Sequence, residues 1–66
     1  MQVILNSKAE IVEKEMNVVD FLLLKGLNLE TVIVEYNEKI IKKDAWLSVM
    51  LQNNDRLEVL KFVGGG

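Results

Sequence analysis

The chain contains no cysteine and no histidine, and this absence limits most strongly how it can fold. A chain of 66 residues buries only a small core, and domains of that size commonly add disulfides or a structural metal. Neither disulfide bonds nor thiolate and imidazole ligands are available here. Because 50% of its residues are hydrophobic, the chain is expected to form one globular domain held by apolar packing alone.

The same absence removes several classes of chemistry. There is no thiol or imidazole nucleophile, no Ser–His or Cys–His pair, and no zinc site built from these ligands. The acidic residues are scattered without the spacing of a metal site. Eight Lys/Arg against ten Asp/Glu give a net charge of −2, which lacks the basic surface of a nucleic-acid binder. We therefore expect no metal and no nucleic-acid partner.

Hydropathy gives no sign of a targeting or membrane segment. Residues 1–6 contain no basic region, and the longest unbroken apolar runs have four residues, such as 21–24. A signal peptide or a membrane span needs a much longer apolar stretch. The expected location is the cytoplasm, with no membrane partner.

The first half of the chain predicts a hairpin followed by a helix. Residues 2–6 and 9–14 have the alternation of two strands. Asn17 is a good N-cap for a helix that begins at Val18, and Gly26 is expected beyond its C-terminus in the left-handed conformation. Spacing at i, i+3 and i+4 predicts a buried stripe that consists of Val19, Leu22 and Leu23.

The second half predicts three further strands. Residues 31–37 are rich in β-branched side chains, a turn follows at 37–38, and residues 39–42 form a short strand. Asn54 lies in a turn signal and is expected to take a positive φ. Residues 57–63 form the last strand.

A short helix is expected between the last two strands. Asp44 is its predicted cap, Trp46 and Leu47 are its apolar residues, and Met50 and Leu51 continue that apolar face. Trp46 is interpreted as a packing anchor rather than a stacking platform for a ligand. The order of elements predicts an α+β fold in which one main helix covers one sheet.

The last strand predicts an exposed apolar patch. Leu57 and Val59 share one face, whereas Glu58 shares the other with Leu60 and Phe62 and indicates that this second face is solvated. Contiguous exposed apolar surface often marks an interaction site. The predicted patch on the outer sheet face consists of Ile4, Ile33, Leu60 and Phe62. The alternative is that Phe62 folds back into the core.

Three of the four glycines stand together at the C-terminus, as Gly64, Gly65 and Gly66. Without Cβ, such a backbone passes a narrow channel, and nothing shields the terminal carbonyl from attack. Three extended residues reach about 10 Å beyond Val63. Considered alone, a terminal glycine run is more often a flexible end than a reactive terminus.

In their order, these segments resemble the ThiS-type sulfur carriers of thiamine biosynthesis, whose fold is the ubiquitin-like β-grasp. The resemblance covers the whole chain. It is carried by residues 1–6, 19–23, 34–37, 40–41, 43–46, 54–59 and 63–66. The chain departs from the family at three turns, where it has Asn37-Glu38 for Asn-Gly, Lys42-Lys43 for Pro-Arg and Asn54-Asp55 for Gly-Asp.

The resemblance implies that the chain is a protein co-substrate rather than an enzyme. In the family, an ATP-dependent ThiF-type enzyme adenylates the terminal glycine, here Gly66, and a relay from a cysteine desulfurase supplies sulfur. The resulting thiocarboxylate donates sulfur to a ThiG-type thiazole synthase. No cofactor is then bound by the chain, since ATP is used by its partner. Residues 1–63 would form the β-grasp domain and residues 64–66 a flexible tail, in which Gly64 and Gly65 thread into the partner.

Two alternatives remain open at this point. One is a carrier for molybdopterin or another sulfur-requiring pathway, although the short length favours the thiamine branch. The other is a β-grasp interaction module, or a ubiquitin-like modifier joined to lysines through Gly66.

Overall fold

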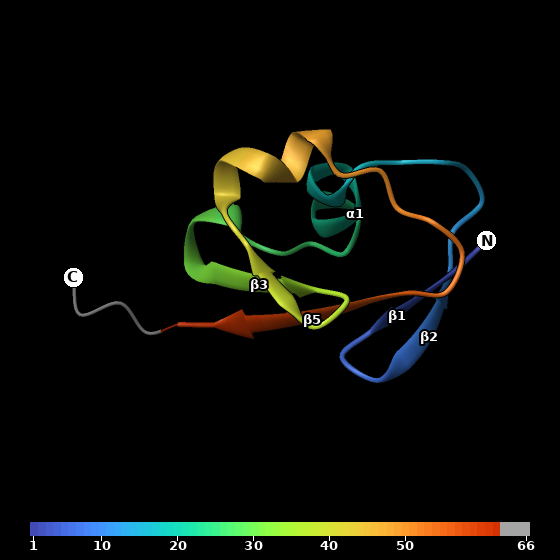
Figure 1. Cartoon of the computed structure of the whole chain (residues 1–66), viewed down its shortest axis with the longest axis horizontal. Coiled ribbons are helices and arrows are strands. Elements are labelled where there is room, and N and C mark those ends of the chain that lie inside the picture. The colour runs from blue at the N-terminus through green and yellow to red at the C-terminus, as the bar shows by residue number, and fades with distance from the viewer. Residues whose placement is uncertain (63–66) are drawn as a thin grey trace.

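The computed structural model describes residues 1–62. The predicted end of the folded domain at Val63 and the predicted tail at residues 64–66 lie outside the described residues. Within them, five strands form one mixed sheet in the order β2-β1-β5-β3-β4 (Figure 1). The strands are β1 (Gln2–Leu5), β2 (Lys8–Ile11), β3 (Val32–Tyr36), β4 (Lys39–Ile41) and β5 (Asp55–Lys61).

The first and last strands lie side by side in this sheet. β1 pairs in parallel with β5, from Val3 opposite Asp55 to Leu5 opposite Leu57, while the other neighbouring strands pair antiparallel. β5 begins two residues earlier than predicted because Asp55 and Arg56 already pair with β1. β5 therefore lies between β1 and β3, and its direction sets where the chain leaves the sheet.

The main helix, α1 (Val18–Leu24), begins and ends as predicted. The Asn17 side-chain oxygen accepts a hydrogen bond from the Asp20 backbone N–H at 2.8 Å. Gly26 has a φ of +73°, and its N–H donates to the Leu23 carbonyl at 3.0 Å. The Leu27 N–H donates to the Leu22 carbonyl at 3.0 Å, which completes a Schellman motif. At seven residues, α1 is the longest helix in the range 1–62 and is too short to cross a bilayer.

The predicted buried stripe of α1 was wrong by one residue. Val18, Phe21 and Leu22 are the buried residues, whereas Leu23 is 56% exposed and Val19 is half-buried. The spacing i, i+3 and i+4 is correct, but six of the seven residues in VVDFLLL are apolar. In so short a helix, this pattern fixes the period and leaves its phase undetermined.

Two 3₁₀ helices, η1 (Leu29–Thr31) and η2 (Lys43–Ser48), complete the fold. The prediction missed η1, whose N-cap is Asn28.

In η2, the prediction that Asp44 caps the helix was wrong, because Lys42 occupies the N-cap and makes no side-chain capping bond. Trp46 is a packing anchor as predicted: it is 2% exposed, and its Nε1–H donates to the Ile41 carbonyl at 3.2 Å. Leu47 is 68% exposed, because consecutive residues of a 3₁₀ helix are about 120° apart and cannot share one face.

Met50 and Leu51, which were predicted to continue the apolar face of η2, differ in burial. Leu51 is buried, whereas Met50 is 46% exposed. Met50 forms an isolated bridge with Asn17, in extended backbone where neighbouring side chains point to opposite sides. Leu51 alone therefore continues the core.

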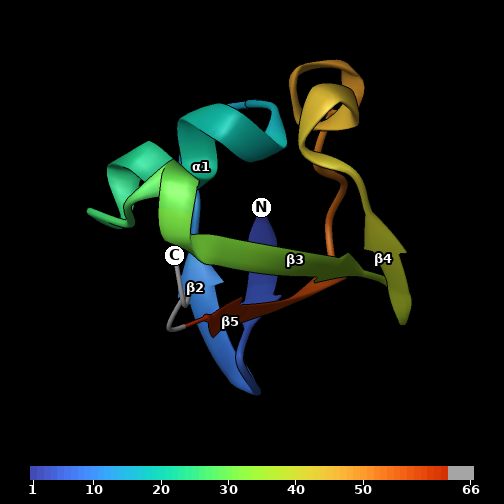
Figure 2. The same ribbon diagram turned by 90° about the vertical axis from the view of Figure 1, so that its left-hand side faces the viewer.

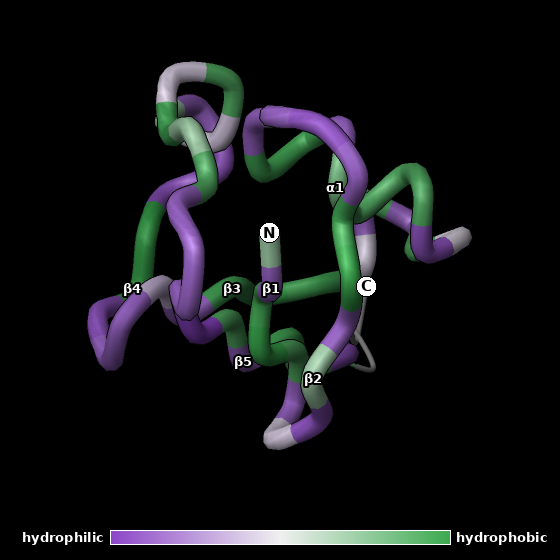
Figure 3. Tube along the Cα trace, turned by 90° about the vertical axis from the view of Figure 1, so that its right-hand side faces the viewer, coloured by the Kyte–Doolittle hydropathy of each residue, from purple (hydrophilic) through white to green (hydrophobic). Residues whose placement is uncertain are grey.

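The core lies between the sheet and the helices. α1 and η2 lie on the same side of the sheet, and the opposite side forms the outer face (Figure 2). The tube in Figure 3 shows β1 and β3 largely in the green of apolar residues. The buried side chains that fill the core are Val3, Val12, Val18, Phe21, Leu22, Val32, Val34, Trp46, Leu51, Leu57 and Val59.

One carboxylate is buried at the start of β5. Asp55, which is 8% exposed, accepts hydrogen bonds from the Tyr36 hydroxyl at 2.7 Å, the Asn37 side-chain amide at 3.1 Å and the Gln52 N–H at 2.7 Å. These bonds join the β3–β4 turn to the loop before β5. Burial, and then the hydrogen bond to Asp55 and its negative charge, raise the pKa of Tyr36 above its ordinary value of 10.0.

Candidate functional site

The end of β5 is held by its neighbours on both sides. On the β3 side, the Phe62 N–H donates to the Thr31 carbonyl at 3.0 Å. On the other side, β1 pairs with β5 only as far as Leu57, and Asn6 then continues the ladder. The Val59 N–H donates to the Asn6 side-chain oxygen at 2.7 Å, and the Asn6 amide donates to the Val59 carbonyl at 3.3 Å. The side chain of Asn6 thus replaces the next residue of a strand.

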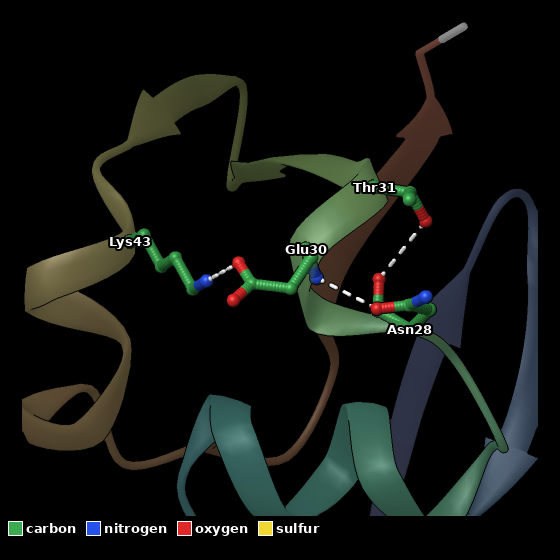
Figure 4. A network of polar contacts seen from close by, with 4 residues as sticks. All are labelled: Asn28, Glu30, Thr31 and Lys43. Carbon is green, nitrogen blue, oxygen red and sulfur yellow. Dashed lines mark hydrogen bonds and ion pairs between the residues drawn. The ribbon is translucent and has the colours of Figure 1, made fainter. Parts of the chain in front are cut away.

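Thr31, which holds Phe62, belongs to a short capped turn (Figure 4). The Asn28 side-chain oxygen accepts from the Glu30 N–H at 2.9 Å, and the Asn28 carbonyl accepts from the Thr31 N–H at 3.1 Å and from its hydroxyl at 3.2 Å. Glu30 also forms an ion pair with Lys43 of η2. Phe62, directly after β5, therefore donates its hydrogen bond to a turn that is held by Asn28 and by the ion pair of Glu30 with Lys43.

Three of the four predicted patch residues come together on the outer face. Ile33 of β3 lies directly opposite Leu60 of β5, and Phe62, the residue directly after β5, is the next outward residue. Leu60 is 52% exposed, Phe62 44% and Ile33 38%. Phe62 does not fold into the core, so the alternative considered for it is wrong. Binding of a partner by this patch remains a prediction.

Ile4, the fourth predicted patch residue, is not part of this group. It is half-buried on β1, opposite Arg56. Leu60 is four residues beyond Arg56 on β5, so Leu60 and Arg56 are about 13 Å apart along the strand. Ile40, which the prediction missed, is 69% exposed on β4 and lies opposite Glu35. Ile40 lies on the outer face because β4 pairs with β3, which in turn pairs with β5. A local sequence pattern does not indicate this pairing.

Residues 2–66 match the sequence model of the ThiS family. The chain belongs to the ThiS family. A crystal structure of a thiamine biosynthesis protein, ThiS, from Geobacter metallireducens covers 100% of both chains with 32% identity and a TM-score of 0.84. A solution structure of a thiamine biosynthesis protein from the same organism has 29% identity and a TM-score of 0.81, covering 100% of this chain and 88% of that one. These matches confirm the predicted ubiquitin-like β-grasp.

Two proteins of similar sequence match this ThiS-family chain over different shares of their own length. The uncharacterized protein ycf40 of Trieres chinensis is 38% identical over 50 residues, which cover 76% of this chain and 68% of that protein. A thiazole synthase of Magnetococcus marinus is 41% identical over 46 residues, covering 67% of this chain but 14% of that protein. In the second case, a ThiS-like segment forms part of a much longer protein.

The predicted reactive residues of the ThiS-family chain, Gly64, Gly65 and Gly66, lie outside the described residues. The structure describes the segment that precedes them, which is the end of β5 with its two hydrogen-bonding anchors, Asn6 and Thr31. It also describes the exposed apolar patch of Ile33, Leu60 and Phe62, hereafter the outer patch. Sequence reasoning missed both anchors. Asn6 contacts a residue 53 positions away, and no local pattern indicates a contact of that kind.

Proposed function

We propose that this chain is a sulfur carrier of thiamine biosynthesis whose C-terminal residue, Gly66, carries the sulfur. The observation that carries the proposal is membership of the ThiS family over residues 2–66, which includes the terminal glycines. The exposed outer patch at the end of β5 supports it, because a carrier presents its C-terminus to another protein and needs a surface on which that protein docks.

The proposed chemistry starts from an unreactive carboxylate. Its negative charge repels nucleophiles, and an oxide ion is a very poor leaving group. A ThiF-type partner removes this barrier when the Gly66 carboxylate attacks the α-phosphorus of ATP and pyrophosphate leaves. A persulfide relayed from a cysteine desulfurase then attacks the acyl carbon of the adenylate through its outer sulfur, and AMP leaves. A thiol attacks the inner sulfur of the resulting acyl disulfide, so that the donor is left as a disulfide and the thiocarboxylate leaves. The sulfur finally rests on Gly66 as a thiocarboxylate, which needs no cysteine in this chain.

Docking by the folded domain offsets the cost of ordering the tail. Fixing each tail residue costs about 1–2 kcal/mol, with glycine at the high end. Burying the exposed apolar surface of Ile33, Leu60 and Phe62 supplies about 25 cal/mol for each Å² removed from water. The outer patch therefore contributes binding energy while Gly64 and Gly65 thread into the active site of the partner.

The partners are proposed from the same chemistry. The thiazole synthase relative, which contains a ThiS-like segment, supports a ThiG-type enzyme as the sulfur acceptor. The ThiF-type enzyme uses the ATP, so the chain itself is a co-substrate and not an enzyme.

Intact-mass measurement tests the proposal. The chain is incubated with the ThiF-type enzyme, ATP, a desulfurase with cysteine, and a reducing thiol, and we expect a gain equal to the replacement of one oxygen by sulfur at Gly66. An unchanged mass, or only conjugates with lysines of other proteins, would contradict the sulfur-carrier function.

A further inference from the structure

Two glutamates lie directly opposite each other on the outer face of the sheet. Glu35 of β3 is the register partner of Glu58 of β5, in the row next to Ile33 and Leu60. Their neighbours on the same strands, Val34 and Val59, are buried on the helix side, so both glutamates point outward. The outer patch is therefore bordered by a pair of like charges.

This arrangement is unfavourable in the isolated domain. Like charges directly opposite each other in an antiparallel pair repel and destabilise it. Within residues 1–62, the ion pairs are Lys25–Glu10 and Lys43–Glu30, so neither Glu35 nor Glu58 has a basic partner there.

The surrounding residues do not neutralise the pair. Arg56 is on the same face of β5, two residues before Glu58, but it forms an ion pair with neither glutamate. On β4, the residue opposite Glu35 is the apolar Ile40, and Lys39 is paired with Tyr36 on the alternate face. Two negative charges and an apolar surface thus lie side by side without a partner in this part of the chain.

We propose that Glu35 and Glu58 together bind a basic side chain of the enzyme that activates Gly66, while the outer patch makes the apolar contact beside it. This inference rests on the proposed function and adds the chemistry of the docking surface. Arginine fits best, because its planar guanidinium offers donors to two carboxylates at once.

Charge complementarity selects the activating enzyme as the occupant. An enzyme that holds the triphosphate of ATP surrounds it with cationic groups. Residues 63–66 span at most about 14 Å, so the docking surface must lie close to that cationic site when Gly66 reaches the α-phosphorus. An acidic pair in the middle of β5, next to the outer patch, is attracted to such surroundings, whereas a basic pair would be repelled.

The test compares the wild-type chain with Glu35→Gln/Glu58→Gln and with a control of equal charge change, Glu13→Gln/Glu15→Gln, in the exposed loop before α1. Thermal unfolding is measured on the isolated chains. The Kd for the activating enzyme is measured by calorimetry at low and high NaCl, and the KM for the chain is measured from pyrophosphate release.

We expect opposite effects on stability and binding. Removing the repulsion should raise the unfolding midpoint by about 1–5 °C. Removing the contact should raise Kd and KM about tenfold at low salt, and it should weaken the salt dependence of binding. The control should change both constants less than about twofold.

The outcomes separate the two proposals. If the wild-type chain is adenylated and Glu35→Gln/Glu58→Gln binds equally well, or no more weakly than the control, this inference is wrong and the proposed function stands. A lower unfolding midpoint would assign the glutamates a structural role and would also overturn it. If the wild-type chain gives no adenylate, both proposals fail.

Discussion

Single residues carry backbone strain in the two hairpin turns. Asn6 and Ser7 have φ values of 49° and 70°, and Asn37 and Glu38 have 48° and 73°. Two positive φ angles in a two-residue loop correspond to a type I′ turn, which favours Asn-Gly. Asparagine tolerates this conformation, but the Cβ atoms of serine and glutamate crowd the backbone. Ser7 and Glu38 are therefore the strained positions.

Glu38→Gly is expected to stabilise the domain. Relief of the left-handed conformation gains about 1–2 kcal/mol, and the extra freedom of glycine in the unfolded chain costs about 0.5–1 kcal/mol. The net gain of about 0.5–1 kcal/mol should appear as a higher midpoint in urea unfolding. Glu38→Ala is the control, because it removes the charge but keeps Cβ. An equal gain from alanine would show that charge, and not backbone strain, is responsible.

The Tyr36–Asp55 hydrogen bond predicts a loss of stability in alkali. Because the folded-state pKa of Tyr36 is raised above 10.0, the hydroxyl holds its proton more tightly in the folded state. The contribution of the protonated Tyr36 hydroxyl to the free energy of unfolding is fully present below pH 10 and is lost as pH rises through the higher folded-state pKa. We expect Tyr36→Phe to be less stable than wild type at about pH 8, with a smaller difference at about pH 11, in urea unfolding. A difference that stays constant with pH would contradict this linkage.

At the scale of elements, the accuracy of sequence prediction depends on how strictly an element alternates. β5 alternates buried and exposed residues from Asp55 to Leu60, so its faces were predicted correctly. α1 offers a single polar residue, Asp20, and its phase could not be fixed. In η2, Trp46 and Leu47 are neighbours in sequence and point about 120° apart, so Trp46 is buried and Leu47 is exposed.

The faces of β5 lead to a prediction that separates binding from stability. Leu60→Glu and Phe62→Glu alter side chains that are 52% and 44% exposed, so each should change the free energy of unfolding by less than about 1 kcal/mol. Each should raise the Kd for the activating enzyme at least about tenfold, because a charge replaces apolar contact. Ile11→Glu is the control, since Ile11 is 75% exposed on the distant edge strand β2. If either substitution lowers the free energy of unfolding more than it weakens the free energy of binding, the side chain has a structural role and the prediction is wrong.

At the scale of the whole molecule, one helical layer protects one face of the sheet and leaves the other available. The order of elements predicted this arrangement, and the family resemblance predicted its topology. The anchors of β5 could not be predicted, because Asn6 and Thr31 meet Val59 and Phe62 only after the sheet has formed. These hydrogen bonds hold the chain at Val59 and Phe62, directly before residues 63–66.

Removing Gly65 and Gly66 is expected to separate folding from function. Val59 is the last buried residue in the range 1–62, and the anchors of β5 end at Phe62, so the deletion removes no known support of the core. The unfolding midpoint should change by less than about 2 °C, whereas pyrophosphate release with the activating enzyme should fall to background. Adding one glycine after Gly66 is the matched control: it keeps every residue but moves the carboxylate by about 3.5 Å. If activation requires the carboxylate at a fixed distance from the docked domain, this addition should lower activation at unchanged stability. Full activity of the deletion variant would contradict a requirement for the terminal glycines, and full activity of the extended variant would contradict a fixed distance. A large drop in midpoint would make the tail part of the folded domain.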